Sequence, residues 1–196
     1  MPPVYDILDS MMYSIVASGV LMGIAFLRLP YQASTDSFGE ENKNLRRGLA
    51  VTMGANGLYL FLAGVHISFN WVFTFSGGIY NIIFGSAALL GGLVLLTIAA
   101  SLFMNGGLKP VSYFAAVVGA YLAVLAYAIF SYNLTSSPLL STLLYLAPAV
   151  TSFVSVPATH IENKWIRRVF AVFALLFAIA WFYFAANVTL AHTKPA

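Results

Sequence analysis

Residues 169–190 read VFAVFALLFAIAWFYFAANVTL, a run of 22 residues without a charged side chain. A transmembrane helix needs about 20 residues to cross roughly 30 Å of bilayer hydrocarbon, and this run is long enough. Five further apolar runs of comparable length cover residues 11–29, 49–71, 79–104, 111–132 and 139–157. The sequence therefore predicts an all-α fold, an integral membrane bundle of six transmembrane helices that forms a single transmembrane domain over residues 1–196.

The composition also indicates a protein embedded in lipid. Hydrophobic residues make up 61% of the 196 residues, against roughly 45–50% in soluble domains. Charged residues make up 8%, which is too few to cover a water-facing surface, so we expect much of the surface to contact lipid. Cysteine is absent, which excludes disulfides, thiolate metal sites and cysteine nucleophiles.

Basic side chains gather on one side of the six predicted spans. Eight of the nine fall on this side, and they are Arg28, Lys43, Arg46, Arg47, Lys109, Lys164, Arg167 and Arg168. Because connections rich in Lys and Arg stay in the cytoplasm, we expect a plasma-membrane protein with both termini outside the cell. The residues interpreted as topology determinants and contacts for anionic lipids are Arg46, Arg47, Lys164, Arg167 and Arg168. This placement at the membrane surface argues against binding of nucleic acid.

Two segments that precede predicted spans resemble each other. Residues 41–51 read ENKNLRRGLAV and residues 162–172 read ENKWIRRVFAV, with seven of eleven aligned positions identical. A weaker match precedes the fourth span, where Lys109 aligns with Lys43. These matches favour three parallel helical hairpins related by an axis along the membrane normal. The alternative is convergence, since every cytoplasmic helix entrance favours basic residues followed by apolar ones.

The longest connection between spans covers residues 30–48. Ser37 and Glu40 have the spacing of a capping box, in which the two side chains pair with backbone N–H groups at a helix start. We therefore expect the second helix to begin near residue 37, well before its apolar run.

Polar residues inside a membrane span are the first place to search for chemistry. On the second span, Asn56, Tyr59, Ala63 and His66 follow one another at spacings of three and four residues, so they share one helix face. Because polar groups exposed to lipid would lack partners, we expect this stripe to face the bundle interior. It forms either an outward-opening path or pocket, or interhelical hydrogen bonds that hold the bundle together.

The sixth span carries a stripe of aromatic side chains, formed by Phe170, Phe173, Phe177, Trp181 and Phe184. Such a stripe can contact the edge of a haem or quinone, although its commoner use is contact with lipid or with a partner helix. The weak candidates for contacts to a cofactor are therefore Asn56, Tyr59, His66 and Trp181, and no particular cofactor is indicated.

Metal and haem ligation have little support, because they require at least two histidines at similar depth. Only His66 and His192 meet this condition, and His192 lies in the C-terminal tail. We therefore predict no metal site. The sequon Asn133-Leu134-Thr135 makes Asn133 a candidate for N-glycosylation in an outer loop, with chance occurrence as the alternative.

Small residues on two spans predict close helix packing. These are Gly85, Ala88 and Gly92 on the third span, and Ala115, Gly119 and Ala123 on the fourth.

Residues 54–96 resemble a known family. The motifs are Gly57-Leu58-Tyr59, Ala63-Gly64, Trp71 and Tyr80-Asn81-Ile82-Ile83-Phe84-Gly85. They are similar to those of the domain-of-unknown-function 981 family, multi-pass membrane proteins of archaea and bacteria. The resemblance implies a membrane fold and a prokaryotic source, and it implies no activity because the family has none established.

Together these features favour a non-catalytic integral membrane subunit or partner of a larger membrane complex, with an electron-transfer (respiratory) chain as one setting. Its expected partners are the lipid bilayer and other membrane subunits or further copies of the chain. One alternative is a small transporter or pore that uses the stripe on the second span. A second alternative is a haem- or quinone-binding membrane protein. No catalytic residues are predicted, because the six spans contain no carboxylate.

Overall fold

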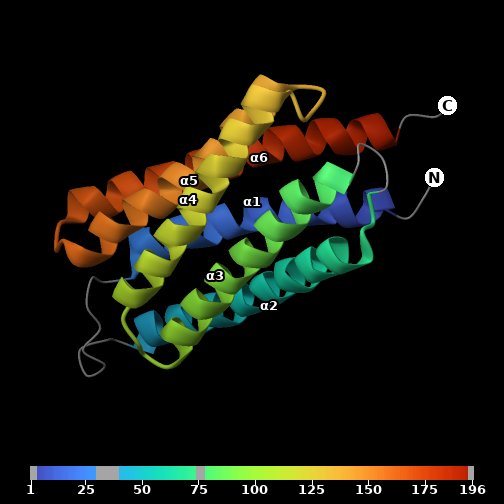
Figure 1. Ribbon diagram of the computed structural model, residues 1–196. Helices are drawn as coiled ribbons and strands as arrows, with labels where there is room; N and C mark the ends of the chain where they lie inside the picture. Colours follow the sequence, from blue (N-terminus) through green and yellow to red (C-terminus); the bar gives the residue numbers. More distant parts are fainter. Residues whose placement is uncertain (1–3, 30–39, 74–77, 194–196) are drawn as a thin grey trace.

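The computed structural model describes residues 4–29, 40–73 and 78–193. The helices in these ranges are α1 (Val4–Arg28), α2 (Glu40–Asn70), α3 (Ala87–Phe103), α4 (Lys109–Tyr132), α5 (Pro138–His160) and α6 (Lys164–His192), with a short π-helix, η3 (Asn81–Ser86), leading into α3 (Figure 1). The described residues contain no strand. Six spans in these ranges are long and apolar enough to cross a membrane, as the sequence predicts. The chain is therefore a multi-pass membrane protein whose helices contact lipid.

Several helices extend beyond the apolar runs that predict them. α2 begins at Glu40, well before the run at 49–71, and α6 begins at Lys164, before the run at 169–190. The added turns are polar and charged, so they belong in the headgroup region, where water can hydrate them. The expected capping residue Ser37 lies outside the described residues.

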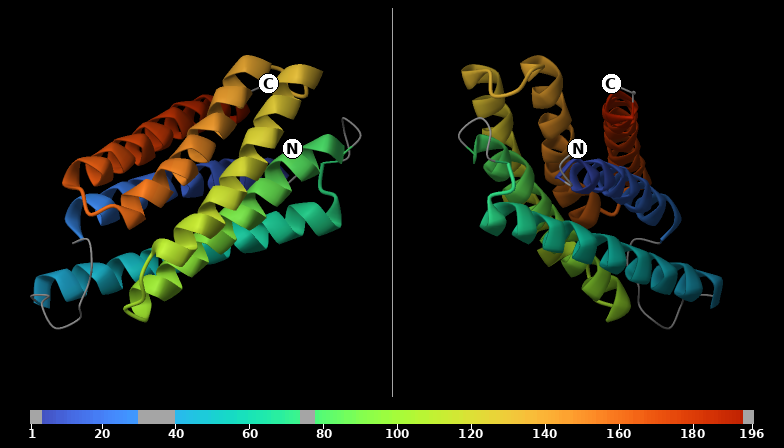
Figure 2. Two further views of the ribbon diagram at one scale, coloured as in Figure 1. Left: turned by 60° about the vertical axis from the view of Figure 1, so that its left-hand side comes forward. Right: turned by 90° about the vertical axis from the view of Figure 1, so that its right-hand side faces the viewer.

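The six helices form a closed ring. Each packs against the helix before it and the helix after it, and α6 returns to pack against α1. The right-hand view of Figure 2 shows this succession of helices around a common centre. Contact is most extensive between α2 and α3, between α4 and α5, and between α6 and α1, whereas α3 and α4 pack least closely among neighbours. The start of α1 and the end of α6 lie at the same end of the ring (Figure 1).

Glycine allows α2 and α3 to approach closely, as the small residues predict. A Cβ on Gly64 would clash with the backbone nitrogen of Leu89, and one on Gly92 would clash with the backbone nitrogen of Phe61. Because no side chain fits at either position, the two backbones are in direct contact there. Gly119 of α4 packs in the same way against α5.

The turn between α2 and α3 is closed by one buried side chain. Asn81 at the start of η3 is 1% exposed, and its Oδ1 accepts a hydrogen bond of 2.9 Å from the backbone N–H of Phe73. Its Nδ2 donates to the carbonyl oxygens of Phe73 and Gly78 at 2.7 and 3.2 Å. Asn81 therefore satisfies backbone groups that no helix pairs, which is required where water is scarce.

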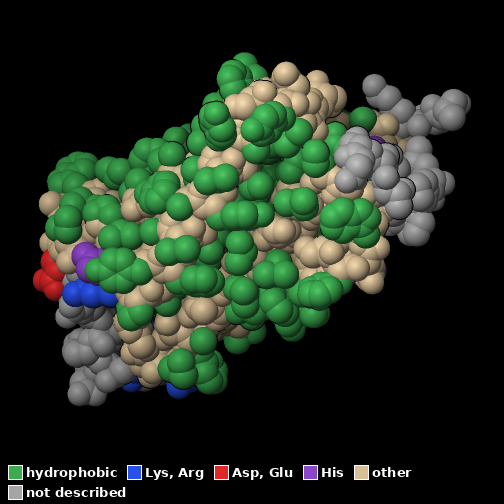
Figure 3. Space-filling view, viewed as in Figure 1, with side chains coloured by type: hydrophobic (Ala, Val, Ile, Leu, Met, Phe, Trp, Pro, Cys, Tyr) green, Lys and Arg blue, Asp and Glu red, His purple; other side chains and the backbone are tan. Residues whose placement is uncertain are grey.

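The surface is apolar except at the ends of the ring. Val117 and Tyr127 on α4 are 68% and 69% exposed, and hydrophobic side chains cover most of the face in Figure 3. The Lys and Arg side chains visible in Figure 3 lie at one end, opposite the first and last described residues. This distribution suits a belt of lipid around the helices and headgroups at the charged end.

Candidate functional site

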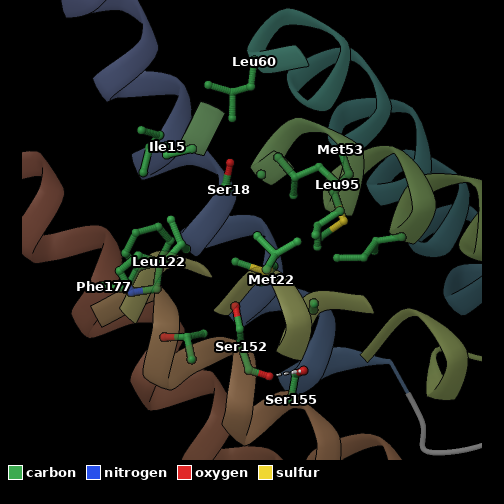
Figure 4. Close-up of a pocket in the computed structure, with 18 of the residues that line it drawn as sticks. Ile15, Ser18, Met22, Met53, Leu60, Leu95, Leu122, Ser152, Ser155 and Phe177 are labelled. Carbon is green, nitrogen blue, oxygen red and sulfur yellow. Dashed lines mark hydrogen bonds between the residues drawn. The ribbon is translucent and has the colours of Figure 1, made fainter. Parts of the chain in front are cut away.

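A cavity of about 160 Å³ lies inside the ring, and all six helices contribute to its wall (Figure 4). α1 alone lines it from Leu8 to Phe26, which corresponds to about 27 Å of helix. The cavity is therefore long and narrow, and it runs through most of the thickness of the bundle.

The wall of this central cavity is almost entirely apolar. Four methionines, Met11, Met12, Met22 and Met53, line it together with aliphatic and aromatic side chains. Figure 4 shows Ile15 and Met22 of α1, Leu95 of α3, Leu122 of α4 and Phe177 of α6 converging on it. Methionine is flexible and polarisable, so this wall can adapt to an irregular apolar guest.

Trp181 occupies one part of the wall and is 4% exposed. Its Nε1 donates a hydrogen bond of 3.0 Å to the carbonyl oxygen of Leu144 on α5. The expectation that the aromatic stripe of α6 contacts lipid or a partner is wrong for Phe170, Phe177 and Trp181, which are buried in the ring. The reason is that α6 lies between α1 and α5 and turns this face toward them.

A second buried aromatic side chain joins α5 to the π-helix. Tyr145 is 4% exposed and lines the cavity, and its hydroxyl donates a hydrogen bond of 2.8 Å to the carbonyl oxygen of Ile83. π-Helical turns insert a residue into the usual hydrogen-bond ladder and recur at functional sites. Tyr145 therefore links this irregular turn to α5, a helix that is not its direct neighbour in the ring.

Hydroxyl groups collect toward the end of the cavity that is nearest the basic residues. Ser112 donates to the carbonyl oxygen of Lys109 at 2.7 Å, and Thr159 donates to Oγ of Ser112 at 2.9 Å. Ser155 donates to the carbonyl oxygen of Ser152 at 2.6 Å (Figure 4). Because these donors are satisfied by nearby acceptors, they can sit beside apolar surface without an unpaired group.

Asn56 makes the most hydrogen bonds of the α2 stripe, and all of them go to α1. Its Oδ1 accepts a hydrogen bond from the Ser14 hydroxyl, and its Nδ2 donates to the carbonyl oxygen of Ser14 and to Oγ of Ser18 at 3.0 and 2.8 Å. These bonds tie α2 to α1 inside the membrane, which corresponds to the interhelical alternative for this stripe.

Ala63 is buried at 8% exposure in a core cluster with Met11 of α1, but the two remaining members of the stripe do not lie in the interior. Tyr59 is 38% exposed and pairs its hydroxyl with that of Ser10, while His66 is exposed and its Nδ1 lies 2.7 Å from Nδ2 of Asn70. The expectation of an interior stripe is therefore wrong for these two residues. His66 lies four residues before the end of α2, where interfacial water satisfies polar groups without burial, whereas Tyr59 is satisfied by the Ser10 hydroxyl of α1. Asn56, Tyr59, Ala63 and His66 do not line the central cavity.

Arg46 occupies a different environment from the other candidate topology residues. It is 6% exposed, and its Nε donates to the carbonyl oxygen of Leu102 at 2.9 Å while its Nη2 donates to that of Gly106 at 3.3 Å. Leu102 is in the last turn of α3 and Gly106 is in the connection that follows it, so Arg46 stabilises the negative end of that helix. Arg46 thus does not contact lipid, whereas Arg47 is exposed.

Arg167 makes a related contact at another helix end. Its Nη2 donates to the carbonyl oxygen of Leu29 at 2.5 Å, and its guanidinium lies 5.5 Å from the ring centre of Phe26. Lys164 and Arg168 are exposed, and the guanidinium of Arg168 lies 5.1 Å from the ring centre of Trp165.

The remaining candidates are separated. Asn133 ends α4 in the left-handed conformation, with a φ of 49°, which asparagine tolerates better than most residues. His192 lies 3.1 Å from a carboxylate oxygen of Asp9 and joins the end of α6 to α1. His66, His160 and His192 therefore do not converge on one site.

Sequence reasoning missed the partners of Asn56 and the hydroxyl groups of α5. A signal for both was present, because Ser14 and Ser18 are four residues apart, as are Thr151, Ser155 and Thr159. This spacing places each set on one helix face. The central cavity itself has no local signal, since its wall draws on every helix.

Comparisons with curated proteins and with solved structures found no match. A family model described as a protein of unknown function, DUF981, matches residues 1–195. The match extends over nearly the whole chain and agrees with the motifs between residues 54 and 96. The chain belongs to the DUF981 family.

Proposed function

We propose that this protein binds a lipid-soluble molecule with one long apolar chain in its central cavity. The observation that carries the proposal is the cavity of about 160 Å³ with an apolar wall drawn from all six helices. An apolar cavity of roughly this size stays dry and accepts apolar guests. If the cavity were empty, the side chains of its wall would lack the dispersion contacts that close packing provides.

The shape of the cavity selects among ligand classes. Its length of about 27 Å along α1 matches an extended acyl or prenyl chain better than a compact ring system. Histidine is the commonest axial ligand of haem, and none of the three histidines lines the cavity. Among the cofactor classes considered, a prenyl quinone therefore fits this wall better than haem.

A chain of this kind would enter from the membrane. The junction of α3 and α4 is the least closely packed between neighbouring helices, so separation there breaks the fewest contacts. We propose this junction as the lateral entrance to the cavity.

A role as a subunit of a larger membrane complex is the second candidate. It is favoured by the exposed polar pairs Ser10–Tyr59 and His66–Asn70, which a partner chain would cover. The buried aromatic face of α6 no longer supports it. Particle mass after extraction in mild detergent separates the two candidates, because a subunit would bring defined partner chains with it.

We further propose that this single transmembrane domain has three hairpin repeats in a plasma membrane, with both termini outside. Arg46 of α2, Ser112 of α4 and Arg167 of α6 occupy corresponding positions in the aligned segments. Each of them contacts the end of the next helix around the ring, which supports the repeat. Arg46 bonds to Leu102 of α3, and Ser112 accepts from Thr159 of α5. Arg167 bonds to Leu29 at the end of α1. The alternation of close and loose helix pairs supports it as well.

The ligand proposal is tested by extracting the protein from its native membrane and identifying bound apolar molecules by mass spectrometry. Gly91 lines the cavity and has no atom near the position of an added Cβ, so Gly91→Phe should fill the cavity and abolish retention. Gly48 is equally unobstructed and does not line the cavity, so Gly48→Phe is the matched control. Retention by Gly91→Phe, or recovery of bulk membrane lipids alone from the wild type, would refute the proposal.

A further inference from the structure

A second cavity, of about 450 Å³, lies at the basic end of the ring. The end of α1, the start of α2 and the connection into α6 form its wall. The lining residues are Phe26, Leu27, Arg28, Leu29, Asn42, Glu162, Asn163, Lys164, Arg167 and Arg168. Because Phe26 also lines the central cavity, this basic cavity lies beside it, at its charged end.

Positive charge dominates the wall of the basic cavity. Arg28, Lys164, Arg167 and Arg168 line it, and among the described lining residues the one carboxylate is that of Glu162. Arg28 and Lys164 make no hydrogen bond or ion pair with any other described residue. Four cations around one cavity repel one another, and an anion in the cavity would offset that repulsion.

Two of these cations are held in place by their neighbours. The bond from Arg167 to the carbonyl oxygen of Leu29 fixes its guanidinium at the end of α1. Arg168 is held against the ring of Trp165. The first turn of α6 contains no acidic residue, so the positive end of its helix dipole adds to the same field, while Arg167 caps the opposing carbonyl end of α1 at Leu29. The fold therefore holds two of the four cations at the wall of the cavity.

The apolar surroundings of the cavity indicate which anion it takes. Leu27 is 52% exposed and Trp165 is 70% exposed beside the four cations. Exposed aromatic and aliphatic groups at the end of a transmembrane bundle lie at the level of lipid headgroups. Basic cavities between transmembrane helices at this depth bind acidic lipid headgroups.

We propose that the basic cavity binds the phosphate headgroup of an anionic phospholipid, with its acyl chains along Leu27 and the outer face of α1. This site is independent of the central cavity, because it recognises a charged headgroup and not an apolar chain. Arg28, Lys164 and Arg168 contact the phosphate, while Arg167 positions the wall through its bond to Leu29.

The test compares two triple variants that remove the same charge from the same end of the protein. The first is Arg28→Gln, Lys164→Gln and Arg168→Gln, and the control is Lys43→Gln, Arg47→Gln and Lys109→Gln. All six side chains are exposed, so both proteins should fold, and thermal unfolding verifies this. Native mass spectrometry of the full-length protein then measures binding of phosphatidylglycerol and phosphatidylcholine.

The wild type should bind phosphatidylglycerol at least tenfold more tightly than phosphatidylcholine. The cavity variant should lose most of this preference, and the control variant should change it by less than about threefold. Equal losses in both variants would mean a diffuse surface attraction and would overturn the proposal. Displacement of phosphatidylglycerol by an equal concentration of inorganic phosphate would also overturn it, because the site would then be one for free phosphate.

Discussion

The indole Nε1 of Trp181 and the carbonyl oxygen of Leu144 are joined by a hydrogen bond of 3.0 Å between α6 and α5. Leu144 lies four residues before Pro148, which lacks the N–H that would otherwise pair with this carbonyl inside α5. Trp181 therefore supplies a donor that the helix itself cannot provide, at a depth where water is absent.

We expect Trp181→Phe to lower the free energy of unfolding by about 1–3 kcal/mol, because it leaves the Leu144 carbonyl buried and unpaired. Pro148→Ala restores the N–H that pairs with the Leu144 carbonyl inside α5. In a protein that carries Pro148→Ala, the loss of unfolding free energy caused by Trp181→Phe should therefore be about 1 kcal/mol smaller. A double-mutant cycle of thermal stability in detergent measures the difference. Trp165→Phe, at a 70% exposed position, serves as the control and should be nearly neutral. Simple additivity of the two substitutions would contradict this explanation.

The contact between α2 and α3 predicts opposite behaviour for two adjacent glycines. Gly92→Ala would place a methyl group against the backbone of Phe61, so we expect a loss of about 3 kcal/mol or more, measured as a lower melting temperature. Gly91→Ala meets no atom within 4 Å and should be neutral or slightly stabilising. Equal effects at the two positions would show that the helices do not touch at Gly92.

Substitutions at the neighbouring residues Arg46 and Arg47 of α2 should also change the stability by different amounts. Arg46→Gln removes a guanidinium that is 6% exposed and bonded to carbonyl groups at the end of α3, so we expect about 2–4 kcal/mol of destabilisation. Arg47→Gln changes an exposed side chain and should stay within about 0.5 kcal/mol. Chemical denaturation of both variants in the same micelle provides the comparison, and a neutral Arg46→Gln would contradict the assigned contacts.

The proposed orientation can be tested directly, because the natural chain contains no cysteine. A single cysteine at Ser136, in the connection between α4 and α5, should react with a membrane-impermeant maleimide in intact cells. One at Gly107, in the connection between α3 and α4, should react only after lysis. The opposite pattern of labelling would reverse the orientation.

The six helices could be predicted from the sequence because the bilayer imposes a minimum apolar length, and the run at 169–190 exceeds it without a charge. The additional turns of α2 and α6 are harder to predict, since polar residues continue a helix at its end as readily as they begin a loop. The π-helix at Asn81 has no signature in the apolar pattern, which runs unbroken through it.

The candidate site could be predicted only in part. The face shared by Asn56, Tyr59 and His66 follows from spacing, but which neighbour covers each residue depends on where α1 crosses α2. The sequence identifies Trp181 as one of a series of aromatic residues on α6. It does not indicate that this side chain points into the ring, because helices in lipid bury aromatic and aliphatic faces alike. The central cavity depends on the order of helices around the ring, which no single segment encodes.

Closure of the ring by α1 and α6 has a consequence for biosynthesis. The closely packed pairs α2–α3 and α4–α5 join helices that are consecutive in the chain, so they can assemble while the ribosome is still at work. Of the six helices, α1 is translated before the others and α6 after them, so α1 must wait for the helix with which it packs most closely. Until then its Gly19 face has no helix against it, since it packs on Ala174 and Ala178. Truncation of the nascent chain before α6 would therefore leave an open ring, exposing α1 to the quality-control proteases of the membrane.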